Sequence, residues 1–137
     1  MNRDLVLAEW GRARMALGAA KLLTAEDFPE DAASRAYYAI LHAAKAVLFV
    51  HDIATMSHAG TRRMFGLHLV RTGQVEPEWA SFLGESLDNR LAADYDSAVS
   101  FSAREAAQET RRSRRFLSRM RRYLLASGFT QNLLNYF

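Results

Sequence analysis

Only two prolines, Pro29 and Pro77, interrupt this chain of 137 residues. Proline is the residue that most strongly ends or kinks a helix, so the long stretches between these positions can be helical. Seven glycines are also few for a fold with many tight turns. No segment alternates apolar and polar residues over a useful length, as a half-buried strand would. The sequence therefore predicts an all-α protein.

Five segments carry apolar residues at the helical period: about 4–23, 29–51, 57–73, 77–95 and 102–126. Pro29 and Pro77 suit the first turn of a helix, and Ser57 suits an N-cap. Gly73 and Gly128 suit the position just after a helix end. The pattern predicts a four- to five-helix up-and-down bundle.

We assign this bundle to residues 1–126, and we expect 127–137 to be a short apolar tail that packs back on it. The second segment is apolar almost all round, which predicts the central, buried helix. In the first segment the residues at helical spacing are Leu5, Ala8, Arg12, Met15, Ala19 and Leu22.

The composition excludes several classes of protein. Without cysteine the chain has no disulfide scaffold, thiolate zinc site, iron–sulfur cluster or cysteine nucleophile. The four histidines lack carboxylates at metal-ligand spacing, and nucleotide-loop and hydrolase motifs are absent, so we expect no metal or cofactor. The N-terminal region is charged and the longest apolar run covers only residues 46–50, so we expect a cytoplasmic protein without a membrane partner.

Polar residues form a stripe on the otherwise apolar second segment. At 100° per residue they fall within an arc of roughly 80°, and they are Asp31, Arg35, Tyr38, His42 and Lys45. One interpretation is a solvated seam with an ion pair between Asp31 and Arg35. The other is that the stripe lines a cleft or a subunit interface.

An arginine interrupts the apolar arc of the fourth segment. Arg90 lies near the middle of this arc, and Asp94 follows one turn later on the same side. The arc consists of Trp79, Phe82, Leu83, Leu87 and Leu91. A buried guanidinium needs a partner. It is therefore either one half of a structural pair with Asp94 or, as we favour, an anion-binding group that Asp94 holds in place.

The fifth segment is strongly basic. Eight arginines and two glutamates between residues 103 and 125 give it a charge of +6, so the rest of the chain carries −3. An apolar seam runs along its other side, through Ala103, Ala106, Thr110, Ser113, Leu117, Met120 and Leu124. Such a helix can follow a phosphate backbone, or the arginines can simply form a solvated face.

Four stretches resemble the HEPN domain, a small α-helical nucleotide-binding family, and most resemble its stand-alone bacterial and archaeal members. They are SRAYYAILHAAKAVL (residues 34–48), the pair Ser57–His58, FGLHLVRTG (65–73) and NRLAADYD (89–96). The resemblance covers roughly residues 5–125. It implies a bundle that commonly dimerises, with a cleft at the interface, and often a small nucleotidyltransferase partner in a toxin–antitoxin module.

The resemblance also implies a metal-independent ribonuclease motif, R-x4–6-H, near the end of the penultimate helix. Arg90 matches the arginine of that motif, but Asp94 and Tyr95 stand where the histidine belongs. Arg35 and His42 have the literal spacing on a different helix. The motif is therefore incomplete, and catalysis would need a substitute base.

These observations give three hypotheses. In the first, the protein is a dimeric nucleotide- or RNA-binding module in which Arg90 and Arg35 bind the anion and Asp94 orients Arg90. The cleft would be lined by Tyr38, His42 and Tyr95. In the second, it is a metal-independent ribonuclease that uses Arg90 with His42 or Tyr95. In the third, it is a structural interaction domain.

Overall fold

The described residues form six α-helices and one π-helical turn. The computed structural model describes residues 1–96, 98 and 100–134, without the side chains of Asp94 and Tyr95. In chain order the elements are α1 (Arg3–Ala25), α2 (Pro29–Val50), α3 (His58–Phe65), the π-helical turn η1 (Gly66–Val70), α4 (Pro77–Tyr95), α5 (Ala103–Ala126) and α6 (Gln131–Leu134). The described residues contain no strand, and the predicted all-α bundle is confirmed.

Local sequence signals explain where these helices begin. The Asn2 side chain accepts a hydrogen bond from the backbone N–H of Leu5, and Ser57 caps α3 through the N–H of Gly60. Ser102 and Glu105 form a reciprocal capping box at the start of α5. Helices α2 and α4 each begin at a proline, whose missing N–H costs nothing in the first turn.

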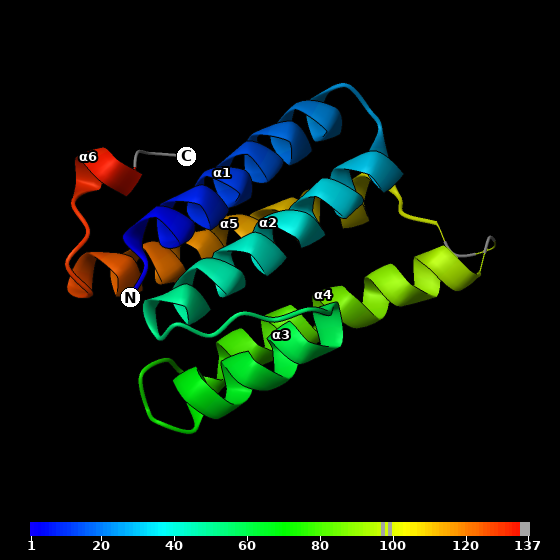
Figure 1. The fold of residues 1–137 in the computed structure, drawn as a ribbon. Helices are drawn as coiled ribbons and strands as arrows, with labels where there is room; N and C mark the ends of the chain where they lie inside the picture. Colours follow the sequence, from blue (N-terminus) through cyan, green and yellow to red (C-terminus); the bar gives the residue numbers. More distant parts are fainter. Residues whose placement is uncertain (97, 99, 135–137) are drawn as a thin grey trace.

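Helix α2 is the central helix, as its sequence predicts. Figure 1 shows α1, α2 and α5 running alongside one another, with α3 and α4 along one side. Helix α2 packs against α1, α5, α3 and α4, and twelve of its residues are buried. Because a helix in this position has little solvent-facing surface, its polar residues stand out as candidates for a site.

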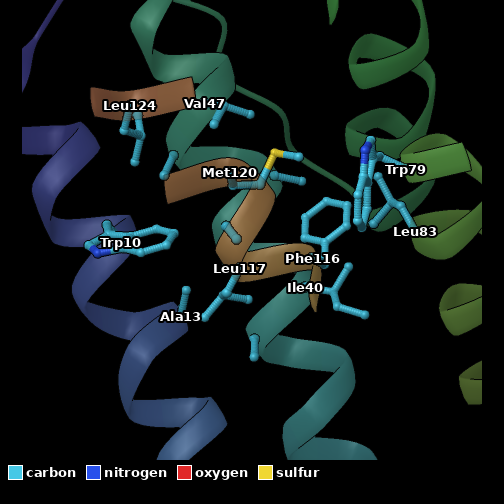
Figure 2. Packing of buried hydrophobic residues seen from close by; sticks show 14 of the residues in the cluster. Trp10, Ala13, Ile40, Val47, Trp79, Leu83, Phe116, Leu117, Met120 and Leu124 are labelled. Atoms are coloured by element: carbon cyan, nitrogen blue, oxygen red, sulfur yellow. The ribbon is translucent and has the colours of Figure 1, made fainter. Parts of the chain in front are cut away.

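Helix α5 contributes several of the large side chains of the core. Phe116 is fully buried, with its ring centroid 5.8 Å from that of Phe65 and 6.2 Å from that of Trp79. On the other side of α5, Leu117 lies near Trp10 and Ala13 of α1 (Figure 2). Fully burying a side chain of this size stabilises the fold by about 1.5–3 kcal/mol. One face of α5 therefore joins α1, α2 and α4 in a single core.

Two of the helical patterns noted in the sequence are not fully buried. In α1 the stripe at helical spacing points outward, because Met15 is 77% and Leu22 62% exposed. The buried face of α1 is formed by Val6, Glu9, Trp10, Ala13, Ala16, Leu17 and Ala20. In α4 the arc is buried only as far as Leu87, whereas Leu91 is 43% exposed, since the end of α4 extends beyond the other helices (Figure 1).

The described part of the tail packs on the bundle. Phe129 and Leu134 are buried, and the indole N–H of Trp10 donates a 2.7 Å hydrogen bond to the Leu134 carbonyl. This contact joins α6 to the first helix of the chain. Within the described residues, no helix is both long and apolar enough to span a membrane.

Candidate functional site: a basic cleft between the first two helices

A buried carboxylate on α1 meets the polar stripe of α2. Glu9 is only 8% exposed. One of its oxygens lies 2.6 Å from Nδ1 of His42, and the other lies 3.7 Å from Nζ of Lys45. Arg12, one turn further along α1, has a guanidinium nitrogen 4.0 Å from the same carboxylate. The negative charge of Glu9 is therefore shared among three basic groups.

These contacts keep Glu9 ionised in spite of its burial. Burial raises the pKa of Glu9, but the hydrogen bond from His42 and the charges of Lys45, His42 and Arg12 lower it by more. The net result is a pKa below the ordinary value. A carboxylate that stays charged in a buried position can orient its partners firmly.

The ionised carboxylate determines the tautomer of His42. A carboxylate only accepts hydrogen bonds, so the proton of the neutral imidazole must lie on Nδ1, the nitrogen that faces Glu9. The second nitrogen, Nε2, is then an acceptor. This is the form in which a histidine can take up a proton from a ligand, with the carboxylate stabilising the resulting imidazolium.

Two depressions meet at this histidine, and we call them together the α1–α2 cleft. The larger, of about 540 Å³, is lined by Arg12, Met15, Ala16, Ala19, Arg35, Tyr38 and His42. The smaller, of about 200 Å³, is lined by Tyr38, Leu41, His42, Lys45, Thr55, Met56, Ser57, His58 and Thr61. Because Tyr38 and His42 line both, a ligand can reach them from either depression.

The tyrosine at this junction is held by its neighbours. The Tyr38 ring centroid lies 6.4 Å from that of His42 and 6.1 Å from that of His58, the first residue of α3. The Arg35 guanidinium lies over the same ring, 5.6 Å from its centroid. Because the N–H donors of a guanidinium lie in its plane, they stay available to a ligand while the face of the group stacks on Tyr38, and Arg35 lines the larger depression. The cleft thus combines aromatic and cationic side chains.

The structure brings together part of the predicted site. Arg35, Tyr38 and His42 share one depression, and Lys45 joins the other. Asp31 is exposed, and in the part of the chain described here it makes no ion pair with Arg35. Arg35 is exposed as well, so the solvated seam describes the first two residues of the stripe, whereas Tyr38, His42 and Lys45 are half-buried.

The predicted residues of α4 lie elsewhere. Arg90 is half-buried near the end of α4, and it is not among the described residues that line either depression. One turn before it, Leu87 packs against Tyr37 and Leu41 of α2. The side chains of Asp94 and Tyr95 lie outside the described residues, so the proposed pairing of Asp94 with Arg90 stays a prediction.

Sequence reasoning missed Glu9, the residue that orients His42. The signal was present, because Glu9 stands directly between Val6 and Ala13 on the stripe that α1 buries. An acidic residue among buried apolar ones calls for a basic partner. The residues that indicated this helix in the sequence, at helical spacing from Leu5 to Leu22, lie on the opposite face of α1 and do not include Glu9. His58 was noted only as part of a resemblance, and its ring contact with Tyr38 depends on the fold.

The chain is similar to a known protein family and to several individual proteins. The model of the HEPN domain matches residues 8–123. The chain is 28% identical over 117 residues to “Putative toxin MJ0142” of Methanocaldococcus jannaschii, covering 85% of this chain and 80% of the relative. It is 42% identical over 79 residues to “Putative toxin MJ0605” of the same organism, covering 58% of this chain and 59% of the relative. A UPF0332 protein of Gloeobacter violaceus is 34% identical over 97 residues, or 71% of this chain and 77% of the relative.

Proposed function

Because the chain belongs to the HEPN domain family, we propose that it is a binding module whose α1–α2 cleft holds a phosphate of a nucleotide or of RNA. One observation carries the proposal: Arg12, Arg35, Tyr38 and His42 line a single depression of about 540 Å³. Guanidinium groups bind phosphate through parallel hydrogen bonds, and the tyrosine offers a face for a base. The same cleft contains a histidine that an ionised carboxylate orients.

The cellular role that we propose is in a toxin–antitoxin-type system. Two of the relatives carry toxin names. The family resemblance adds a homodimer and a small nucleotidyltransferase partner. The exposed apolar stripe of α1 supports dimerisation, because Met15, which lines the cleft, and Leu22 leave large apolar side chains in water. A second copy packed there would cover these side chains and enclose the ligand.

In this proposal the residues of α4 belong to a cleft that the second copy completes. The resemblance matches Arg90 to the arginine of the family motif, and we further assign Asp94 to orient Arg90 and Tyr95 to line the cleft. Arg90 lies outside the depressions of a single chain. Its contribution is therefore tied to dimerisation, and replacing Arg90 with alanine should weaken ligand binding only under conditions where the dimer forms.

Calorimetric titration with adenosine 5′-monophosphate tests the binding function. Arg35→Gln should lower the affinity at least about tenfold, since it removes one charge-assisted contact. The exposed Arg71, which lies after η1 and does not line the cleft, provides a control of equal charge, Arg71→Gln. Equal affinities for the wild type and Arg35→Gln would overturn the assignment of the cleft.

The contact between Glu9 and His42 favours a second candidate function, metal-independent cleavage of RNA. Nε2 of His42 would take the proton of the 2′-hydroxyl as its oxygen bonds to phosphorus. The bond from phosphorus to the 5′-oxygen would break, and that oxygen would receive a proton from His58 or Tyr38. The products would be a 2′,3′-cyclic phosphate and a 5′-hydroxyl. The cationic side chains would stabilise the charge at phosphorus.

Cleavage of labelled single-stranded RNA in EDTA tests this second candidate. Activity that is lost in His42→Gln and retained in His68→Gln would establish it, because His68 lies in η1 outside the cleft. Cleavage that is equal in the wild type and His42→Gln would remove His42 from the mechanism and overturn this second candidate as stated here.

A further inference from the structure

A second depression lies on the other side of the core, where α5 meets the start of α4. Its volume is about 530 Å³, and none of its lining residues belongs to the α1–α2 cleft. We call it the α5 arginine groove, and its lining includes Trp79, Arg111, Arg114, Arg115, Arg119 and Arg122. Trp79 also contacts the core at Phe116 (Figure 2), so the groove rests on a rigid base.

Most of the positive charge in this groove is not neutralised. Arg119 is bound by Glu76, with N–O distances of 2.8 and 3.2 Å, and by the Gln74 carbonyl. No carboxylate of the described residues pairs with the exposed Arg111, Arg114 or Arg122. Three solvated guanidinium groups therefore share one face of one helix.

The spacing of these arginines suits a linear polyanion. Positions separated by three, four, seven or eight residues lie on the same side of a helix. At 1.5 Å per residue, Arg111 and Arg122 are about 17 Å apart along the axis. This distance is longer than a single phosphate group. It matches the length of a nucleic-acid strand that carries several consecutive phosphates.

The chemistry of the groove favours a nucleic acid over a protein partner. Arginine is common at the centre of protein interfaces, but there it lies in well-packed pockets without water, and Trp and Tyr are the other frequent anchors. None of the large exposed apolar side chains of the described residues lies on α5, and Trp79 is only 7% exposed. We propose that the α5 arginine groove is a second binding site, which holds the phosphate backbone of single-stranded RNA without reading its sequence.

Salt-dependent binding of fluorescein-labelled oligouridine tests the proposal. The test variant replaces Arg111, Arg114 and Arg122 with glutamine. The control variant carries Lys21→Gln, Arg63→Gln and Arg71→Gln, so that the net charge is the same but the groove is intact. Between about 50 and 200 mM KCl, the slope of log affinity against log salt should fall in magnitude by about 2 in the test variant.

The control variant should keep the wild-type slope. Equal slopes in the two triple variants would overturn the proposal. If both slopes were reduced, net charge alone would account for binding, and if both were unchanged, neither set of charges would contact the RNA. The cleft is tested separately: Arg35→Gln should weaken binding of adenosine 5′-monophosphate and leave the salt slope contributed by the groove unchanged.

Tryptophan fluorescence locates the strand on the protein. Trp79 lines the groove, whereas Trp10 is 1% exposed on α1. Unlabelled oligouridine should change the emission of the wild-type protein but not that of Trp79→Phe. A change that persists in Trp79→Phe would contradict the proposal. Displacement of the RNA by polyglutamate of equal charge at equal concentration would assign the groove to an acidic protein segment instead.

Discussion

The α1–α2 cleft and the α5 arginine groove are both basic, but they hold their charges differently. In the cleft, a carboxylate that is 8% exposed fixes His42 at 2.6 Å and lies near two further basic groups. On α5, most arginines point into water, and Arg119 pairs with Glu76, a largely exposed residue. The cleft is therefore organised before a ligand arrives, whereas the groove is not.

This difference separates two kinds of recognition. Oriented, partly buried groups can select one geometry of ligand, and they lose little freedom on binding. Exposed arginines attract any polyanion, and salt weakens that attraction. The comparison predicts that substitutions near Glu9 change stability and selectivity, whereas substitutions on the face of α5 mainly change salt-dependent attraction.

The largest effect is expected for Glu9→Gln. It removes the charge that His42 and Lys45 share and leaves both near a neutral amide. We expect a loss of about 1–3 kcal/mol in the free energy of unfolding at neutral pH. Denaturant unfolding measures this loss, with the exposed Glu78→Gln as a control. A loss no greater than that of the control would mean that the carboxylate does not organise the cleft.

The pH dependence of that loss is the second expectation. Folding lowers the pKa of Glu9, so its stabilisation is complete above the ordinary value of 4.5 and is lost as the pH falls through the folded-state pKa. The gap in stability between the wild type and Glu9→Gln should therefore narrow below about pH 4.5. A gap that stays constant down to pH values well below this would contradict the lowered pKa.

A smaller change in stability, of opposite sign, is expected for Glu109→Gln on α5. Burial raises the pKa of Glu109, and the charge of Arg112 and the hydrogen bond from Asn89 only partly oppose this. The ionised form is therefore a cost to folding at neutral pH, and the cost disappears as acid protonates the group. Glu109→Gln should raise the melting temperature slightly at pH 7 and leave it unchanged near pH 4. A lower melting temperature at pH 7 would contradict this sign.

The smallest effect is expected for Glu76→Gln. Hydrogen bonds from Arg119 and Trp79 lower the pKa of Glu76 to about 2. However, the carboxylate is largely exposed, and water screens such a pair. The loss of stability should stay below about 1 kcal/mol and shrink in high salt. Unfolding measured with and without added KCl checks both points, and a loss as large as that of Glu9→Gln would remove the contrast between the two regions.

The sequence predicted the helices well because their signals are local. Pro29, Pro77, Ser57 and Ser102 act on their own helix ends, and the observed bounds differ from the expected ones by a few residues at most. The third segment shows what local signals do not predict. Helix α3 continues into the π-helical turn η1, which no local pattern in the sequence indicated.

The site was harder to predict because it depends on which faces meet. The polar stripe of α2 was visible, but its partner Glu9 is 33 positions away from His42 in the chain. Two alternating apolar stripes on α1 compete for the core. The stripe that carries the large Trp10 side chain is the one that packs, with Trp10 and Leu17 buried and Met15 and Leu22 exposed. The approach of His58 to Tyr38 depends on the packing of α3, which periodicity does not specify.

The most direct test of the cleft is a titration with adenosine 5′-monophosphate followed through the imidazole NMR signals of the four histidines. His42 and His58 line the cleft, whereas His51 and His68 do not. The signals of His42 and His58 should shift together and saturate at one dissociation constant, while those of His51 and His68 stay in place. Unmoved signals from His42 and His58, or equal shifts of all four, would contradict the phosphate-binding function of the α1–α2 cleft.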